Sequence, residues 1–128
     1  MALPKIMKTV ALKAAAVTLA AETVIGGEID VRNYNTMVVY VNYVNGDETS
    51  VDIIPKVLHA PSGNEYPFME WSEAAVSLRT AKIFRLTATG KAYIVLDVRG
   101  INIIKLYEDA TGGTPTGTTA VDYTVISE

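Results

Sequence analysis

Residues 36–58, TMVVYVNYVNGDETSVDIIPKVL, contain two apolar runs, and their pattern indicates the fold class. Between the runs lies a short polar loop, residues 45–49, which we call the knot although no threading of the chain is meant. The first run, 36–44, is apolar on both faces, which is typical of a central β-strand. In the second run, 50–58, an apolar residue occupies every second position, as in a strand. Pro55 cannot donate a backbone hydrogen bond, so it indicates a sheet edge or a bulge. The knot begins with Asn-Gly, a strong hairpin signal, and the stretch therefore predicts a hairpin.

The knot itself, residues 45–49, has two interpretations. It places the carboxylates of Asp47 and Glu48 on one loop, and such loops can hold calcium or a sugar. However, the ligand spacing of an EF-hand is absent. Asp47, Glu48 and Thr49 can instead extend the turn and hydrogen-bond to its backbone. We therefore expect a structural turn whose acids are at most exposed contacts with a neighbouring subunit.

The rest of the chain from residue 28 onward continues the β pattern. Val, Ile, Thr and Tyr dominate it, and Gly, Pro, Asn and Asp interrupt it. Residues 68–80 fit either a strand or a helical turn capped by Ser72. About eight closely spaced strands with no long amphipathic helix between them predict an all-β fold, an antiparallel β-sandwich of jelly-roll-like type. Besides 36–44 and 50–58, the expected strands are 28–33, 81–89, 92–98, 101–109 and 119–127, with turns at 90–91 and 99–100 and loops at 59–67 and 110–118.

The N-terminal segment is rich in alanine, and two conformations suit it. Its alanine content favours a helix. Its alternation and its β-branched residues, with no clear cap before them, favour an extended arm or a first strand. We therefore expect an N-terminal arm or strand over residues 1–27, followed by a β-sandwich domain over 28–128. Early lysines followed by apolar residues resemble a signal peptide, but Lys13 interrupts the apolar stretch.

Composition limits the class of partner. A chain of 128 residues is near the commonest domain size. The net charge of −3 provides no basic stripe for phosphates, so we expect no nucleic-acid partner. No run reaches the roughly 18 uncharged apolar residues that span a bilayer, so we expect no membrane partner. The absence of cysteine excludes disulfides, zinc-thiolate sites and thiol nucleophiles.

Catalytic and cofactor motifs do not emerge from the sequence. His59 is the only histidine, and neither a nucleophile elbow nor a zinc ligand set accompanies it. The carboxylates are scattered, and no motif selects a pair for glycoside hydrolysis. The segment TGGTPTG, 111–117, lacks the lysine and the strand-to-helix context of a P-loop. We therefore expect no catalytic, cofactor-binding or metal site and no enzyme activity, although a pocket with two carboxylates of raised pKa would favour an enzyme.

The densest aromatic cluster lies at residues 66–71. Tyr and Trp are enriched at binding hot spots, so the cluster fits a subunit interface or a sugar-stacking platform as well as a core at a strand end. The apolar residues of the N-terminal arm could also dock on a partner. The candidate interface residues are Val10, Leu12, Val17, Leu19, Tyr66, Phe68 and Trp71.

Four stretches in this order resemble a known family. They are IDVRNYNTMVVYVNYVNGDETSVDI (29–53), PSGNEYPFMEW (61–71), FRLTATGKAYIVLDVRG (84–100) and the Gly/Thr-rich hairpin GGTPTGTTAVDYTV (112–125). Together they resemble the small virion structural proteins of tailed bacteriophages and prophages, especially capsid-decoration-like β-sandwiches. The resemblance covers about residues 28–126 and rests on turn chemistry. HAPSGNEY (59–66) departs from the usual aspartate-glycine turn of this family.

The resemblance implies a non-enzymatic structural role. Decoration proteins sit on the capsid surface, often as trimers at three-fold positions, and bind the major capsid protein to stabilise the shell. It therefore implies a homo-oligomer, with a trimer favoured, whose partners are the major capsid protein or other virion proteins. It also implies a chain located in the virion and assembled in the bacterial host cytoplasm. The alternative is a carbohydrate-binding or adhesin-like β-sandwich module, for which the aromatic cluster beside acidic loops is the motivating feature.

Overall fold

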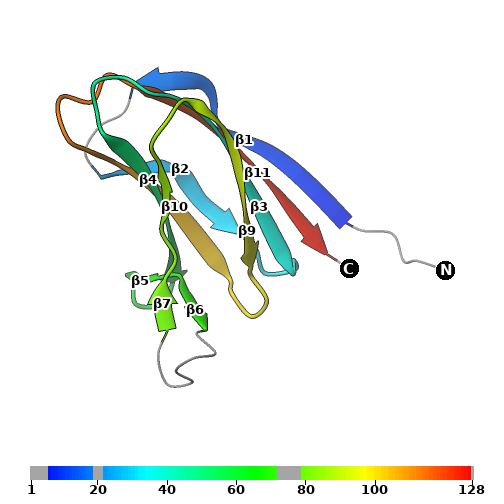
Figure 1. Ribbon diagram of the computed structural model, residues 1–128. Coiled ribbons are helices and arrows are strands. Elements are labelled where there is room, and N and C mark those ends of the chain that lie inside the picture. Colours follow the sequence, from blue (N-terminus) through cyan, green and yellow to red (C-terminus); the bar gives the residue numbers. More distant parts are fainter. Residues whose placement is uncertain (1–5, 19–21, 72–78, 128) are drawn as a thin grey trace.

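Alternating apolar and polar residues build two antiparallel sheets that face each other (Figure 1). The computed structural model describes residues 6–18, 22–71 and 79–127. Sheet A has the strand order β1–β11–β3–β9, and sheet B has the order β2–β10–β4–β5, with β8 also pairing with β4. The strands of sheet A are β1 (Ile6–Thr18), β3 (Thr36–Val44), β9 (Gly90–Asp97) and β11 (Thr118–Ser127). Those of sheet B are β2 (Thr23–Asp30), β4 (Ser50–His59), β5 (Asn64–Pro67), β8 (Phe84–Leu86) and β10 (Ile103–Thr111).

An excursion between β4 and β8 interrupts the order of strands along the chain, and only part of it belongs to sheet B. It contains β5 and a separate two-stranded hairpin of β6 (Met69–Trp71) and β7 (Arg79–Ala81). The hairpin extends away from the end of the sandwich (Figure 1). The helical turn considered at Ser72 lies outside the described residues.

The connectivity is that of a jelly roll. When the excursion is set aside, the eight remaining described strands follow the order first–eighth–third–sixth in sheet A and second–seventh–fourth–fifth in sheet B. Two interlocked Greek keys give this arrangement. The predicted all-β, antiparallel, jelly-roll-like sandwich is therefore confirmed.

The hairpin predicted for residues 36–58 is wrong. β3 pairs with β11 and β9 in sheet A, whereas β4 pairs with β10, β5 and β8 in sheet B. The knot therefore crosses from one sheet to the other. A tight Asn-Gly turn of type I′ needs positive φ at both central residues, and neither Asn45 nor Gly46 has it. The segment 112–117 likewise crosses between β10 and β11, so it does not form a hairpin either.

Several predicted element bounds also differ from those of the structure. The expected domain boundary between residues 27 and 28 falls inside β2, and the segment before it is extended because β1 pairs with β11. The expected loop at 59–67 contains β5, and the expected turn at 90–91 is the start of β9. These differences arise because cross-strand pairing, of β2 with β10, β5 with β4 and β9 with β3, extends elements beyond their local sequence signals.

Pro55 lies in the middle of sheet B, although the sequence placed it at an edge or a bulge. One side of β4 pairs with β10 from Ser50 to Leu58, and Pro55 lies opposite Leu106 in this pairing. The other side pairs with β8 up to Ile53 and with β5 from Lys56 onward. The carbonyl of Pro55 accepts from the Phe68 amide on that interrupted side, so the missing N–H faces the gap between two short strands.

The core lies between the sheets and consists of the inward-facing residues of both. These residues are almost completely buried. Along each strand that supplies them, apolar residues that point inward alternate with polar or exposed residues that point outward. The most buried side chains include Met37, Val39, Tyr43, Val51, Ile53, Leu96, Ile104, Leu106 and Val121.

Candidate interaction surface

The predicted interface residues of the N-terminal segment lie along sheet A. Val10 is opposite Tyr123 and Val17 is opposite Thr119 in the pairing of β1 with β11. Leu12 falls at a register shift between Ala11 and Lys13. Leu19 lies outside the described residues. The three described positions belong to β1 at the edge of sheet A, which agrees with the first-strand alternative of the prediction.

The predicted aromatic cluster is divided by the structure. The Phe68 side chain is only 6% exposed and joins the core. Its amide donates to Pro55 O at 3.2 Å, and its carbonyl accepts from Lys82 N at 2.8 Å. Phe68 therefore anchors the base of the β6–β7 hairpin. Trp71 ends β6 opposite Arg79, and its side chain lies outside the described residues.

Exposed apolar side chains surround this anchor. Tyr66 on β5 is 52% exposed, and Met69 and Ile83 are also exposed. All three belong to the excursion that leaves the sandwich between β4 and β8 (Figure 1). The excursion therefore presents apolar surface to solvent while its backbone is fixed to the body through Phe68.

A second apolar surface was not anticipated from the sequence. We call it the tyrosine face and define it as Val38, Tyr40, Tyr93 and Val95 on the outer side of sheet A. Tyr40 is paired with Tyr93, and Val38 with Val95, in the register of β3 with β9. Tyr93 is 70% exposed and Tyr40 is 42% exposed. The sequence predicts 36–44 as a central strand that is apolar on both faces, and β3 does lie between β11 and β9, but its outer face is exposed.

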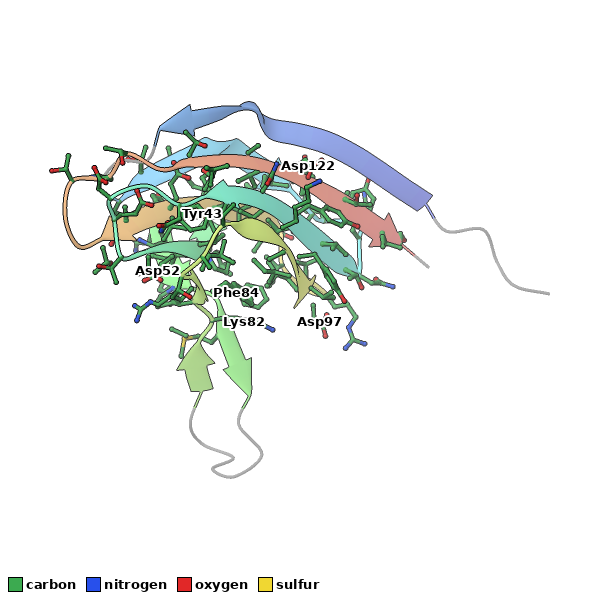
Figure 2. The ribbon with its side chains drawn as sticks, turned by 45° about the horizontal axis from the view of Figure 1, so that its top comes forward. Tyr43, Asp52, Lys82, Phe84, Asp97 and Asp122 are labelled. Carbon is green, nitrogen blue, oxygen red and sulfur yellow. The ribbon has the colours of Figure 1, made fainter. Side chains whose placement is uncertain are left out.

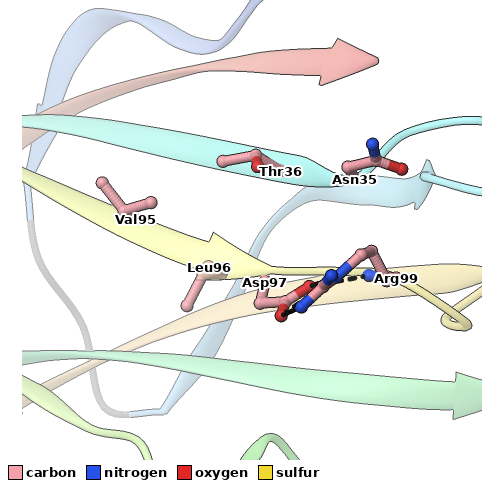
Figure 3. Close-up of a pocket in the computed structure, with 6 residues that line it drawn as sticks. All are labelled: Asn35, Thr36, Val95, Leu96, Asp97 and Arg99. Atoms are coloured by element: carbon pink, nitrogen blue, oxygen red, sulfur yellow. Dashed lines mark hydrogen bonds and ion pairs between the residues drawn. The ribbon is translucent and has the colours of Figure 1, made fainter. Parts of the chain in front are cut away.

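A shallow open depression of about 280 Å³ adjoins one end of the tyrosine face (Figure 3). Asp97 and Arg99 form a two-pronged ion pair there, with Nε–Oδ1 at 2.9 Å and Nη2–Oδ2 at 2.6 Å. The Arg99 guanidinium and its backbone amide lower the pKa of Asp97. This end therefore offers a fixed pair of opposite charges beside apolar groups. Its lining residues are Asn35, Thr36, Val95, Leu96, Asp97 and Arg99.

The knot at residues 45–49 contains a buried carboxylate. Glu48 is 3% exposed, so our expectation that the acids of the knot are exposed is wrong for this residue and holds only for Asp47. Glu48 Oε2 accepts from Tyr43 Oη at 2.5 Å and from Gly46 N at 2.7 Å. Glu48 Oε1 accepts from Gly117 N at 2.6 Å. The carboxylate therefore ties β3 and the knot to the other crossing loop.

The hydrogen bonds at Glu48 outweigh the effect of its burial. Burial alone would raise the pKa of this carboxyl. The donors from Tyr43, Gly46 and Gly117 lower the pKa to about 2, so the group is charged at neutral pH. We refer to Glu48, Tyr43, Asn45, Gly46 and Gly117 together as the Glu48 network.

The Glu48 network and the depression lie at opposite ends of the sandwich. Tyr43 lies near the end of β3 and Asp97 ends β9, and Figure 2 labels both residues. The register agrees, because Tyr43 is paired with Gly90 at the start of β9, whereas Asp97 is at its end.

Other acidic side chains are also engaged in contacts. Asp52 accepts from Arg85 through both oxygens, with Oδ1–Nε at 2.8 Å and Oδ2–Nη2 at 3.0 Å. The buried Glu108 accepts from Thr119 Oγ1 at 2.6 Å. Glu65 accepts from Tyr107 Oη, and this hydrogen bond lowers the pKa of Glu65. These carboxylates therefore join β4 to β8, β5 to β10 across β4, and β10 of sheet B to β11 of sheet A.

His59 is exposed, and its Nδ1 lies 2.6 Å from Ser62 Oγ in the loop after β4. In the part of the chain that the structure describes, no group of three His, Asp or Glu side chains gathers as a metal site. The same part holds no helix long and apolar enough to cross a membrane.

Comparison with known proteins identifies a structural neighbour. No protein-family model and no curated protein matches the chain. Among solved structures, the SPBc2 prophage-derived protein YomS matches with a TM-score of 0.63 and 15% identity, over 99% of this chain and 98% of that chain. The chain therefore shares its fold with a prophage-derived protein. A structure of Bacillus endospore appendages, described as disulfide-linked pili, matches with a TM-score of 0.38 and 12% identity, over 96% of this chain and 82% of that chain; this score does not establish a common fold.

Proposed function

We propose that the chain is a non-enzymatic virion structural protein, and within that class a capsid decoration subunit that binds the major capsid protein. The fold that it shares with a prophage-derived protein over nearly its whole length supports a phage origin. The observation that carries the proposal is the excursion between β4 and β8. It combines a fixed base at Phe68 with exposed apolar side chains at Tyr66, Met69 and Ile83.

The excursion has the features expected of a docking element. Large apolar side chains gathered in one region mark interaction sites on soluble proteins. Docking loses less conformational entropy when the backbone beneath those side chains is already ordered. The two backbone hydrogen bonds of Phe68 and its buried ring provide this order. In this proposal the excursion contacts the shell, and the sandwich stands on the capsid surface as a homo-oligomer with other copies.

Particles of the phage that encodes the chain provide the test. Antibody labelling in electron microscopy should place the chain on the shell, and particles lacking it should lose DNA at a lower temperature. A label confined to the tail would contradict the decoration role, and absence from purified particles would contradict the virion role altogether.

The docking element can be tested separately by co-sedimentation with shells that lack the chain. Tyr66→Lys with Met69→Lys places two charges among the exposed apolar groups and should abolish binding. Val44→Lys is the matched control, because Val44 is equally exposed on β3 but lies outside the excursion. Equal binding by the double variant and the control would exclude the excursion as the docking element.

A second candidate function rests on the tyrosine face. Two paired, exposed tyrosines beside the depression with Asn35 and Thr36 could stack on a sugar and hydrogen-bond to its hydroxyls. This would make the chain a carbohydrate-binding module. Glycan-array binding that is lost on Tyr93→Ala, in a variant with unchanged circular dichroism, would support it, and an array without signal would exclude it.

A further inference from the structure

The free edges of the two sheets differ in how they are protected. β1 is interrupted by register shifts at residues 11–13 and 13–17. β2 has a bulge opposite Lys105, where Gly26 has a φ of 66°. β5 and β8 have only four and three residues. Bulges and short length are common means of preventing an edge from pairing with another chain.

β9 has neither protection. It contains eight residues, and its register with β3 runs without a shift from Gly90 to Asp97. Its middle is the apolar run Ala92–Leu96. In the part of the chain that the structure describes, β3 is the only strand that pairs with it. A long, regular, apolar edge of this kind is suited to accept another strand.

The backbone groups on this free edge can be assigned. The amide of Val98 donates to Asn35 O at 3.0 Å, toward β3. Because the hydrogen-bonding direction alternates along an antiparallel strand, the N–H and C=O groups of residues 91, 93, 95 and 97 point away from β3. The side chains of the same four residues are exposed on the outer face of sheet A.

We propose that a second copy of this chain pairs with β9 through its own β9, antiparallel and about a two-fold axis at Ile94. In this register Lys91 lies opposite Asp97 of the second copy, and Tyr93 lies opposite Val95 of the second copy. The backbone groups of all four residues at the free edge, 91, 93, 95 and 97, then form hydrogen bonds with the second copy. A shift of the register by two residues leaves one of the four without a partner, so this register makes the most hydrogen bonds.

The charges of β9 select the same register and the same partner. Lys91 and Asp97 lie at equal distances in sequence from Ile94, and they carry opposite charges. The hydrogen bonds from Arg99 keep the Asp97 carboxylate charged, and its side chain is 60% exposed, so it is open to a second cation. The strand is therefore complementary to itself in the antiparallel direction, which favours a second copy over an unrelated chain.

The pairing also accounts for the tyrosine face. Tyr40 lies beside Tyr93 in one copy, and Tyr93 would lie beside Val95 and then Val38 of the second copy. The two four-stranded sheets A would become one continuous sheet with an apolar stripe across it. Pairs of aromatic and β-branched side chains across neighbouring strands stabilise such sheets.

This proposal does not rest on the proposed function, because a chain that is absent from virions can still dimerise through β9. It adds a two-fold contact to any three-fold assembly. The first test is sedimentation equilibrium and native mass spectrometry of the full chain over a wide concentration range. Dimers, or even-numbered assemblies such as a dimer of trimers, are the expected result.

Tyr93→Lys should separate the copies, because it places a lysine on the edge opposite Val95. We expect dimerisation to weaken by about tenfold or more, since the two-fold axis repeats each change. Val44→Lys is the matched control on the same face and should keep wild-type dimerisation. A monomer at all concentrations, or an assembly that Tyr93→Lys leaves intact, would overturn the proposal.

The register has its own test, which a general loss of solubility cannot imitate. In a dimer of Lys91→Asp, an acid at position 91 faces Asp97 of the second copy at both contacts. In a dimer of Asp97→Lys, Lys91 faces a lysine at position 97. Because like charges repel, each variant should dimerise weakly with itself. A mixture of the two variants restores opposite charges at both contacts and should form mixed dimers, which native mass spectrometry resolves by mass. A statistical distribution of the two homodimers and the mixed dimer would exclude this register.

Discussion

Tyr43 and Tyr40 are three residues apart on β3, and they belong to opposite kinds of environment. Tyr43 is fully buried and donates to the Glu48 carboxylate, whereas Tyr40 is exposed and paired with Tyr93 on the outer face. Successive side chains of a strand point to opposite faces, so an odd spacing separates them. We call the end of the sandwich that holds the Glu48 network the closed end, and the tyrosine face the open face. We expect changes at the closed end to alter stability and changes at the open face to alter association.

The difference rests on how polar groups are satisfied. At the closed end, two loops cross between the sheets, and their amides point at one carboxylate. At the open face, the backbone N–H and C=O groups of β9 that point away from β3 can pair with another strand. Changes at the closed end should therefore alter the free energy of unfolding, and changes at the open face should leave it nearly unaltered.

The largest effect is expected from Gly46→Ala. A Cβ at Gly46 would collide with the backbone and side chain of Thr116 and with Gly117 N, so the two crossing loops would have to separate. We expect the free energy of unfolding to fall by about 4 kcal/mol. Urea unfolding followed by circular dichroism measures this, with Gly27→Ala as the control, because a Cβ at Gly27 has no atom within 4 Å. Equal stability of the two variants would show that the loops are not locked together.

Glu48→Gln should have the next largest effect. The amide has the shape of the carboxylate but no charge, and its NH₂ group would face donors from Tyr43, Gly46 or Gly117. We expect a loss of about 3 kcal/mol at pH 7, because buried donors would be left without an acceptor. Asp47→Asn is the control one residue away, and its exposed side chain should change stability by less than about 0.5 kcal/mol.

The pH dependence of unfolding isolates the charge at Glu48. Its pKa is lowered from 4.5 to about 2 in the folded chain, so its stabilising contribution is complete above pH 4.5 and is lost as the pH falls towards 2. The shift corresponds to roughly 3 kcal/mol. Asp97 and Glu65 also have lowered pKa values, but they contribute equally to both proteins. The difference between wild type and Glu48→Gln should therefore shrink over this range, and a constant difference would contradict the assignment.

Tyr43→Phe compares the two tyrosines directly. Removing the buried hydroxyl takes one donor from Glu48 and one acceptor from Asn45 Nδ2, which lies 2.7 Å from it. We expect a loss of about 1–2 kcal/mol and a rise in the pKa of Glu48. Tyr40→Phe, measured by the same urea titration, should be indistinguishable from wild type. A similar loss in both variants would remove the distinction between the two faces.

Local patterns predicted the strands well and their partners poorly. The alternation in 36–44 and 50–58 identified β3 and β4 almost to the residue, because burial of one face is written into the sequence. The same local signals made the knot a hairpin, since Asn-Gly carries no information on which sheet the next strand joins. The sequence predicts Glu48 to be an exposed acid, since its donors Gly117 and Thr116 lie about seventy residues away and no local pattern indicates them. The pattern of 36–44 correctly predicted a central strand, but it did not show that the outer face of β3 is exposed, because alternation alone does not reveal what covers a face.

The smallest effect is expected at the depression, from Arg99→Ala. Both members of the Asp97–Arg99 pair are largely exposed, and exposed ion pairs contribute little because water and salt screen them. The urea midpoint should therefore equal that of wild type within error, at low and at high salt. The pKa of Asp97, followed by NMR, should nevertheless rise toward its ordinary value, because Arg99 is the main cause of its lowering. Because a pKa shift and a stability change are linked, the rise in this pKa should be accompanied by an equally small loss of stability, in contrast to the large linked effect at the Glu48 network. A large fall in the urea midpoint would instead place both ends in the same class.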